Sequence, residues 1–366
     1  MTAFEFSAPY NGDPRLIPLL ESLNDRTDAR IREVYLSGPV EYCSSGRVAY
    51  NGDLDSFSLL VRRLHECGMK VNLVMNSTCE GVEWYSDGYL GYVHDFVSYM
   101  VHDLGIEALT LANPIVMRQI HAWVPEVELC ASVLGDVDCT ERAKTFADAG
   151  ATVVTPDVGI NRDLETLRRI KEETGLELKV MVNEGCLHKC AFRKFHFNAI
   201  SHIQRDSARV GNGVSRQEFK DLCNQVAGNM FFRSCGAQID QDPAQILRSG
   251  WIRPEDLEEY AEITTYFKIS GRTVATRAVE RMVKAYLDQS YDGDLLDIMD
   301  SSLRVYSMAK NVSVDNKALG EADFFSHVKN CGRNCGSCGY CDSLVDRVLE
   351  YGKPSETKQA DRAYFA

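Results

Sequence analysis

The chain has 366 residues, 45% hydrophobic and 25% charged, which is the composition of a globular protein with a sizeable core. Its net charge of −13 at pH 7 disfavours a general attraction to nucleic-acid backbones, and no run of eighteen apolar residues predicts a membrane span. The first fifteen residues lack the basic and apolar regions of a secretory signal, so we expect a cytoplasmic protein.

Strand-like and helix-like segments alternate along much of the chain. Buried strands are predicted at residues 32–38, 71–76, 108–112, 127–133, 152–156 and 178–182. Helices are predicted between them, the last with Asn161 as its N-cap, at residues 57–67, 93–104, 115–123, 140–149 and 161–173. Another strand and helix are predicted at residues 266–271 and 276–287. With an eighth strand expected near residues 229–232, this order predicts an α/β fold of the TIM-like (β/α)8 barrel type.

The alternating pattern is interrupted once and ends before the chain does. Residues 186–250 form a long irregular insertion, and a loop of that length in a compact domain is usually functional. After Asp294 the barrel pattern stops. We therefore predict a barrel domain over residues 1–293 that includes the insertion, and a small Cys-rich C-terminal appendage over residues 294–366.

Thirteen cysteines are many for a cytoplasmic protein, where clustered thiols indicate metal binding or catalysis more often than disulfides. The insertion contains Cys186, Cys190, Cys223 and Cys235. The first two follow directly after a predicted strand, where barrel enzymes place their chemistry. Buried cysteines with only a packing role are the alternative interpretation. The insertion is therefore a candidate metal site.

The sequence around the first two cysteines is basic. Arg193, Lys194 and His196 follow Cys190 closely. Positive charge stabilises a thiolate relative to a thiol, so we expect these neighbours to lower the pKa of the cysteines.

The appendage contains four cysteines within eleven residues, Cys331, Cys335, Cys338 and Cys341. Glycines between them let the backbone fold closely around a metal centre. Four thiolates fit either zinc or an iron–sulfur cluster. The spacing of the first three also matches the CxxxCxxC motif of radical-SAM enzymes, but that motif is expected in the first barrel loop and not in a tail.

Ionisable residues near the insertion cysteines are candidates for catalysis. Glu184 is a candidate general base, or a residue that orients the loop. His188 and His196 are candidates for proton transfer, with a purely structural role as the alternative.

Four arginines are candidates for binding a carboxylate, Arg193, Arg233, Arg253 and Arg272. Alternatively, Arg253 and Arg272 only pair with Glu255 or Asp256 and brace the barrel. No HExxH or GxSxG motif of a conventional peptidase occurs in the sequence.

Several separate motifs share the pattern of one known family, at residues 112–114, 131–133, 143–150, 177–186, 251–257 and 267–272. They resemble peptidase family U32 over most of residues 30–290. The NEGCxxxCxFRxxHFN box at residues 183–198 and the Cys-rich tail are most similar to one branch of that family.

The resemblance implies a barrel-like fold and a 4Fe–4S cluster, with Cys186, Cys190 and Cys235 at ligand positions. The fourth ligand stays open, with Cys223 as a candidate, because the box here reads Asn-Glu-Gly where better-known members have His-Gly. Those members are oxygen-independent hydroxylases of ubiquinone precursors or of tRNA and rRNA bases, and some take the hydroxyl group from prephenate.

The resemblance therefore implies an iron–sulfur-dependent hydroxylase with an unknown acceptor. The alternatives are a U32 peptidase and a non-catalytic iron–sulfur partner subunit. We expect one 4Fe–4S cluster, or two if the tail binds a second, with zinc as the alternative at the tail. The negative charge favours a small molecule or peptide as substrate over nucleic acid, and related hydroxylases suggest a homodimer or a heterodimer with a related subunit.

Overall fold

The architecture was obtained as a computed structural model. It describes residues 3–24, 28–39, 45–47, 52–81, 84, 86–209, 233–352, 357–359 and 361, and for residues 203–209 it describes the backbone alone. Within these residues no helix is long and apolar enough to cross a membrane.

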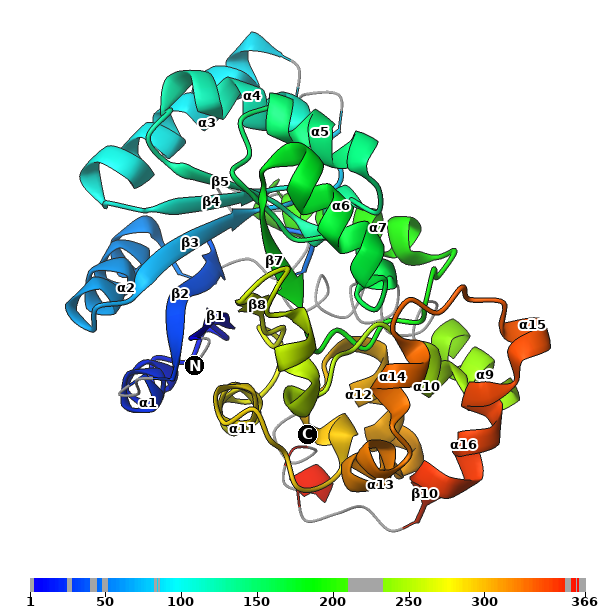
Figure 1. Ribbon diagram of the computed structural model, residues 1–366. Coiled ribbons are helices and arrows are strands. Elements are labelled where there is room, and N and C mark those ends of the chain that lie inside the picture. Colours follow the sequence, from blue (N-terminus) through cyan, green and yellow to red (C-terminus); the bar gives the residue numbers. More distant parts are fainter. Residues whose placement is uncertain are drawn as a thin grey trace.

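Eight parallel strands form a closed barrel, in which each strand pairs with the next and the last pairs with the first (Figure 1). The strands are β1 (Phe4–Pro9), β2 (Ala29–Ser37), β3 (Lys70–Met75), β4 (Ala108–Leu111), β5 (Glu128–Ala131), β6 (Val153–Val154), β7 (Glu177–Met181) and β8 (Tyr266–Lys268). The predicted α/β fold with a TIM-like barrel is confirmed.

One strand was predicted in the wrong place. The barrel is closed by β1 at the N-terminus, where no strand was predicted, and not by residues 229–232, which lie outside the described residues. The β1 segment is only six residues long. Phe4 and Phe6 alternate with polar residues, but this pattern is too short to predict a strand from the sequence alone. The strand becomes evident only from its pairing with β2 and β8.

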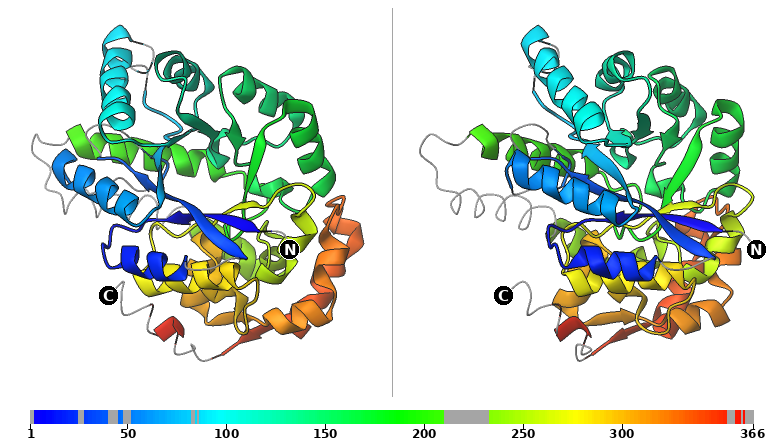
Figure 2. Two further views of the ribbon diagram at one scale, coloured as in Figure 1. Left: turned by 60° about the vertical axis from the view of Figure 1, so that its left-hand side comes forward. Right: turned by 90° about the vertical axis from the view of Figure 1, so that its left-hand side faces the viewer.

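Helices between the strands cover the outside of the barrel (Figures 1 and 2). They are α1 (Leu16–Leu23), α2 (Leu54–Glu66), α3 (Asp87–Ser98), which continues as a π-helical turn η2 (Tyr99–Asp103), α4 (Pro114–Trp123), α5 (Thr140–Asp148), α6 (Leu164–Thr174) and α11 (Thr276–Leu287). Asp163, and not Asn161, is the N-cap of α6. The Asn161 amide instead donates to the carbonyls of Met181 and Gly250 at 2.6 and 2.7 Å, so it joins two loops at the end of the barrel.

Short helices follow several strands or lie in the insertion. They are η3 (Val133–Gly135), η4 (Val158–Ile160), α7 (Arg193–Arg209), α9 (Arg233–Gln241), α10 (Gln245–Arg248) and η6 (Pro254–Tyr260). The elements after the barrel are η7 (Leu295–Ile298), α12 (Ser301–Lys310), β9 (Val312–Val314), α13 (Asn316–Glu321), α14 (Phe324–Val328), α15 (Cys335–Cys338), α16 (Tyr340–Val348) and β10 (Leu349–Tyr351), with β9 and β10 antiparallel. In Figures 1 and 2 these elements lie together beside α9, α10 and α11.

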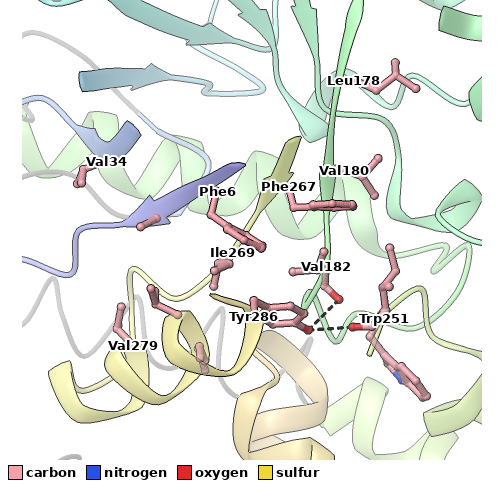
Figure 3. Packing of buried hydrophobic residues seen from close by; sticks show 14 of the residues in the cluster. Phe6, Val34, Leu178, Val180, Val182, Trp251, Phe267, Ile269, Val279 and Tyr286 are labelled. Carbon is pink, nitrogen blue, oxygen red and sulfur yellow. Dashed lines mark hydrogen bonds between the residues drawn. The ribbon is translucent and has the colours of Figure 1, made fainter. Parts of the chain in front are cut away.

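The main hydrophobic core lies between the outer face of the barrel and the surrounding helices. Figure 3 shows Phe6, Val180 and Phe267 in this layer, together with Tyr286 of α11, whose hydroxyl donates to the carbonyl of Ile252 at 2.9 Å. The same apolar cluster continues into the C-terminal elements through Leu303 and other residues. Residues before and after Asp294, where the barrel pattern ends, therefore bury apolar area in one cluster.

The inside of the barrel is polar. At the amino-terminal end of the strands, Arg32 bonds to the carboxylates of Glu5, Glu128 and Glu177 at 2.7–3.2 Å. In the middle, the buried Glu33 carboxylate accepts hydrogen bonds from Lys179 at 2.7 Å and from Ser7 and Asn72. These layers fill the lower and middle parts of the barrel, so any space for a ligand lies at the carboxyl end.

Candidate functional site

A chamber opens at the carboxyl ends of the strands. Its polar lining comes from β2, β8 and the loops that follow the strands, and comprises Tyr35, Arg47, Asn76, Ser132, Glu184, Lys268, Ser270 and Arg272. Below it, burial acts to raise the pKa of Glu33, but Lys179 and Ser7 hold that pKa at about 2. The Glu33–Lys179 pair is therefore ionised and forms a fixed floor for the chamber.

Glu184 lies at the centre of the polar wall and is 1% exposed. Its carboxylate accepts from Arg193 at 2.9 Å, from Arg47 at 3.1 Å and from the Cys186 thiol at 3.2 Å. Burial acts to raise its pKa, but the two guanidinium groups lower the pKa to about 2. An ionised carboxylate held by two arginines is a weak base, so the geometry favours the orienting role over the general-base role.

Two residues that the sequence analysis missed complete this wall. Arg47 donates to Asp300 at 2.6 Å and to Ser301 at 2.6 Å, and the Asp300 carboxylate also accepts from Ser270. Asp300 belongs to the segment after the barrel, and its backbone pairs with Asn183 and Gly185. No local sequence pattern marks either residue, because their role depends on contacts more than a hundred residues apart in the chain.

The insertion brings Cys190 and Cys235 into contact. The Cys235 thiol donates a hydrogen bond to the Cys190 sulfur, and this bond is the largest cause that lowers the pKa of Cys190 to about 6. The same bond, together with burial, raises the pKa of Cys235. Within this hydrogen-bonded pair Cys190 is the more acidic thiol.

Cys186 behaves differently from what we predicted. Burial and the Glu184 carboxylate raise its pKa to about 12, against the opposing effect of Arg193 and Arg47. The expectation that the basic neighbours favour the thiolate is therefore wrong for Cys186, because the arginine charges are neutralised by Glu184. For Cys190 the pKa is lowered mainly by the Cys235 hydrogen bond, and of the three predicted neighbours Arg193 contributes to this shift.

The positions of the insertion cysteines exclude some kinds of metal site and suit others. Among the described residues, no three or more Cys, His, Asp or Glu side chains surround a common point as a single metal ion needs. In a 4Fe–4S cluster each thiolate binds a separate iron, so the sulfurs stand farther apart than around one ion. Cys190 and Cys235 touch, and Cys186 lies within electrostatic range of Cys235, whereas Cys223 lies outside the described residues. These three thiols have the donor chemistry and the shared location that a cluster needs, but the hydrogen-bonded sulfurs of Cys190 and Cys235 would have to move apart to bind separate irons.

The two histidines have different charged neighbours. Burial and the positive charge of Arg333 lower the pKa of His188 to about 4, and its buried Nδ1 has no hydrogen-bond partner among the described residues. His196 stacks on Phe197 with ring centroids 5.6 Å apart, and burial and Arg47 lower its pKa to about 4. Both rings are neutral at pH 7, which suits a hydrogen-bonding or ligand role.

The four predicted arginines separate into different locations. Arg193 and Arg272 are at the chamber, where Arg272 donates to the hydroxyls of Ser37 and Ser45. Arg253 pairs with Glu255 at 3.2 Å and with Asp256 at 3.7 Å, which corresponds to the bracing alternative. Arg233 is exposed at the first residue of α9.

The tail cysteines lie near the surface, away from the chamber. Cys331, Cys335 and Cys341 are partly buried and Cys338 is exposed. Burial raises the pKa of Cys341, and the charges of Cys335 and Cys331 act in the same direction, so these sulfurs are electrostatic neighbours. The tail is held against α10 by the Arg248–Asp342 pair at 2.7 Å.

A larger cavity of about 340 Å³ lies outside the chamber. Its lining includes Trp84, Asn113, Pro114 and the start of α7, and it shares Leu134 and Phe197 with the chamber. Lys194, which lines this cavity, pairs with Asp136 at 3.0 Å. The two spaces are neighbours at Leu134 and Phe197, and the charged chamber is the narrower of the two.

Comparisons with known proteins identify the family. A curated relative, described as an uncharacterized protease of Methanocaldococcus jannaschii, is 26% identical over 332 residues, covering 90% of this chain and 92% of the relative. The solved structure of a U32 peptidase is 18% identical, with a TM-score of 0.51, and the match covers 74% of this chain and 94% of that one. A chitinase from Rhizomucor miehei is 10% identical, with a TM-score of 0.40, over 78% of this chain and 99% of its own.

The sequence profile of peptidase family U32 matches residues 19–218. This match extends from α1 through the cysteine loop and beyond α7. The resemblance at family level is thereby confirmed, while the assignment to a branch with the cysteine box and Cys-rich tail stays a prediction. The chain belongs to peptidase family U32.

Proposed function

We propose that this U32 protein is an iron–sulfur-dependent, oxygen-independent hydroxylase that takes its hydroxyl group from a small anionic donor such as prephenate. The observation that carries the proposal is the position of Cys186, Cys190 and Cys235 directly beside a cationic chamber at the carboxyl end of the barrel. Active sites of barrel enzymes lie at this end.

Cys186, Cys190 and Cys235 would hold the cluster. A 4Fe–4S cluster with three protein ligands offers its fourth iron to an oxygen-bearing ligand. Glu184 holds Arg47 and Arg193 in place beside Cys186 and the lining of the site. The loop that carries Cys186 is anchored to α12 through the backbone of Gly185, which keeps the thiol oriented.

The test of the cofactor is purification without oxygen, followed by iron and sulfide analysis. We expect about four of each per chain for one cluster, or about eight if the tail cysteines hold a second. Cys186→Ala and Cys235→Ala should lose the visible absorbance of the barrel cluster. The matched variant Cys139→Ala, at the start of α5, should retain it. Zinc without iron in the protein would contradict the proposal.

The test of the activity is incubation of the intact holoprotein with prephenate and candidate acceptors under anoxia. A product heavier by one oxygen atom, detected by mass spectrometry and absent with Cys186→Ala, is the expected outcome. If the cluster is intact and no acceptor from small-molecule or RNA pools is hydroxylated, the hydroxylase proposal fails.

Peptidase activity is the second candidate, since the curated relative is described as a protease. The lowered pKa of Cys190 would suit a nucleophilic thiolate, but burial and Arg47 lower the pKa of His196 to about 4, which makes this imidazole a weak catalytic base. Cleavage of denatured protein substrates that survives cluster removal and is lost in Cys190→Ala would favour this candidate. A cluster without either activity would favour the partner-subunit alternative.

A further inference from the structure

Lys268 occupies an unusual position in the chamber. It is the last residue of β8, its side chain lines the chamber, and the residue is 6% exposed. Its Nζ lies 3.8 Å from the centre of the Tyr35 ring. Among the described residues it makes no hydrogen bond and no ion pair, and its amine lies over the Tyr35 ring in the wall of the chamber.

The neighbouring lysine shows how this barrel neutralises a buried amine that has a structural role. Lys179 of β7 is 0% exposed and bonds to the Glu33 carboxylate at 2.7 Å. Buried charges in proteins are normally paired in this way. Within the described part of the chain Lys268 pairs with no carboxylate, which indicates that a ligand supplies its partner.

The charges of the chamber lead to the same conclusion. Arg47 and Arg272 line the chamber, and Arg193 lines the adjoining cavity and pairs with Glu184. Arg47 also pairs with Glu184 and Asp300, and Arg272 donates to the hydroxyls of Ser37 and Ser45. Two guanidinium groups and the Lys268 amine therefore line one small space, an arrangement that favours an anionic ligand.

The shape of the site limits the kind of anion. Leu134 and Phe197 line both the chamber and the outer cavity of about 340 Å³, which also has Trp84 and Pro114 in its wall. The narrow chamber accepts a head group, and the outer cavity accepts a larger body with apolar or aromatic surface.

We propose that the chamber binds the carboxylate head group of a small organic acid with a cyclic or aromatic body, and that Lys268, together with Arg272, is the residue that binds this carboxylate. The inference deepens the proposed function, because it names the subsite for the anionic donor. The identity of the acid is the one part of this inference that rests on the proposed function.

Binding of an anion beside Lys268 should be linked to uptake of a proton. Burial and the positive charges of Lys179 and Arg272 lower the pKa of Lys268 to about 7, and Cys130 and Glu33 act in the opposite direction. A bound carboxylate favours the ammonium form and raises the pKa again. The ionisable groups facing Lys268 are those of Glu33, Tyr35, Arg47, Cys130, Lys179, Glu184 and Arg272.

The experiment is isothermal titration calorimetry of the anaerobically purified full chain with phenylacetate and with its neutral analogue phenylacetamide. Measurements at pH 8 in two buffers with different heats of ionisation give the number of protons taken up. We expect phenylacetate to bind with uptake of a proton. The amide should bind at least about tenfold more weakly, because it lacks a charge-assisted hydrogen bond.

Variants separate Lys268 from its surroundings. Lys268→Met should weaken phenylacetate at least about tenfold and abolish proton uptake. Lys268→Arg, which stays protonated, should retain most of the affinity and lose the uptake. Lys144→Met, at an exposed lysine of α5, should behave like the wild type. A circular dichroism melt of each variant shows whether it is folded.

Equal affinity for the acid and the amide, no binding of the acid to the folded wild type, or unchanged affinity in Lys268→Met would overturn the inference. Iron and sulfide are measured on the same samples. If the chain never holds iron but binds the acid through Lys268, the proposed function is refuted and the carboxylate subsite is supported. If the chain holds an intact cluster but does not bind the acid through Lys268, the carboxylate subsite is refuted and the cofactor part of the proposed function is supported.

Discussion

Two lysines of the barrel interior lead to opposite predictions for stability. Lys179→Met leaves the buried Glu33 carboxylate without its partner, and we expect the free energy of unfolding to fall by about 3–5 kcal/mol. Lys268→Met removes a buried amine that makes no hydrogen bond to any described residue, and we expect the free energy of unfolding to stay the same or rise by about 1 kcal/mol. Urea denaturation at pH 8 measures both. A loss in Lys268→Met as large as in Lys179→Met would indicate a structural role for Lys268.

Asp256 predicts a pH dependence of stability. Burial raises its pKa to about 6, although Arg253 lies 3.7 Å away and acts to lower it. The folded state then binds the proton more tightly than the unfolded state. This contribution to stability is fully present below about pH 4 and is lost as the pH rises through about 6.

Asp256→Asn removes this titration. The stability of the variant relative to the wild type should therefore increase by about 2 kcal/mol between pH 4 and pH 7. Urea midpoints at several pH values provide the measurement, with Asp103→Asn, at an exposed position of η2, as the control. A relative stability that is flat with pH would show that Asp256 is ionised normally in the fold.

At the scale of elements, the cysteine loop depends on its contact with α12. The backbone N–H of Gly185 donates to the Asp300 carbonyl at 3.1 Å, and the Leu303 N–H donates to the Gly185 carbonyl at 3.0 Å. A Cβ atom at Gly185 would lie 2.5 Å from the Asp300 carbonyl oxygen and 2.7 Å from Leu303 Cβ. Close approach of two backbones is therefore the reason for glycine at this position.

Gly185→Ala should push α12 away from the loop. We expect the free energy of unfolding to fall by about 1–3 kcal/mol, because overpacking of a tight contact has that effect, and we expect less iron per chain after anaerobic purification. Gly91→Ala is the matched control, since a Cβ at this position in α3 meets nothing within 4 Å. It should stabilise the helix by about 0.5–1 kcal/mol. Equal stability of the two variants would contradict the proposed anchoring.

At the scale of the whole molecule, the barrel and the C-terminal elements share buried residues. Trp251 is 1% exposed and stacks on Phe324 of α14 with ring centroids 5.4 Å apart, and the Arg162 guanidinium lies over the same indole at 4.3 Å. The Asn183 amide near the cysteines also donates to the carbonyl of Ile298, at 3.1 Å. The predicted division at residues 293 and 294 therefore runs through a shared core.

This shared core predicts that the chain unfolds in one transition. In a Trp84→Phe, Trp123→Phe background, the fluorescence of Trp251 reports on the junction, and far-ultraviolet circular dichroism reports on all helices and strands. We expect the two urea curves to coincide. Two separated transitions, with the fluorescence change in only one of them, would show that the barrel and the appendage are independent domains.

The sequence by itself determined the repeating architecture and the family. The helix over Thr276–Leu287 was predicted with its observed bounds, because its apolar residues recur at helical spacing and that pattern is local. The spacing of Cys186 and Cys190 after β7 similarly identified the candidate site from adjacent residues alone. Local patterns of this kind are encoded in a few neighbouring residues, so they can be interpreted without the fold.

Only the tertiary structure decided the closure of the barrel by β1 and the electrostatics of the site. Arg47, Glu184 and Asp300 come from three distant segments, and their contacts reverse the expected pKa shift of Cys186. Lys268 resembles any strand lysine in the sequence until burial removes its water and no carboxylate replaces it. Desolvation and charge pairing depend on distances in three dimensions, which the order of residues along the chain does not specify.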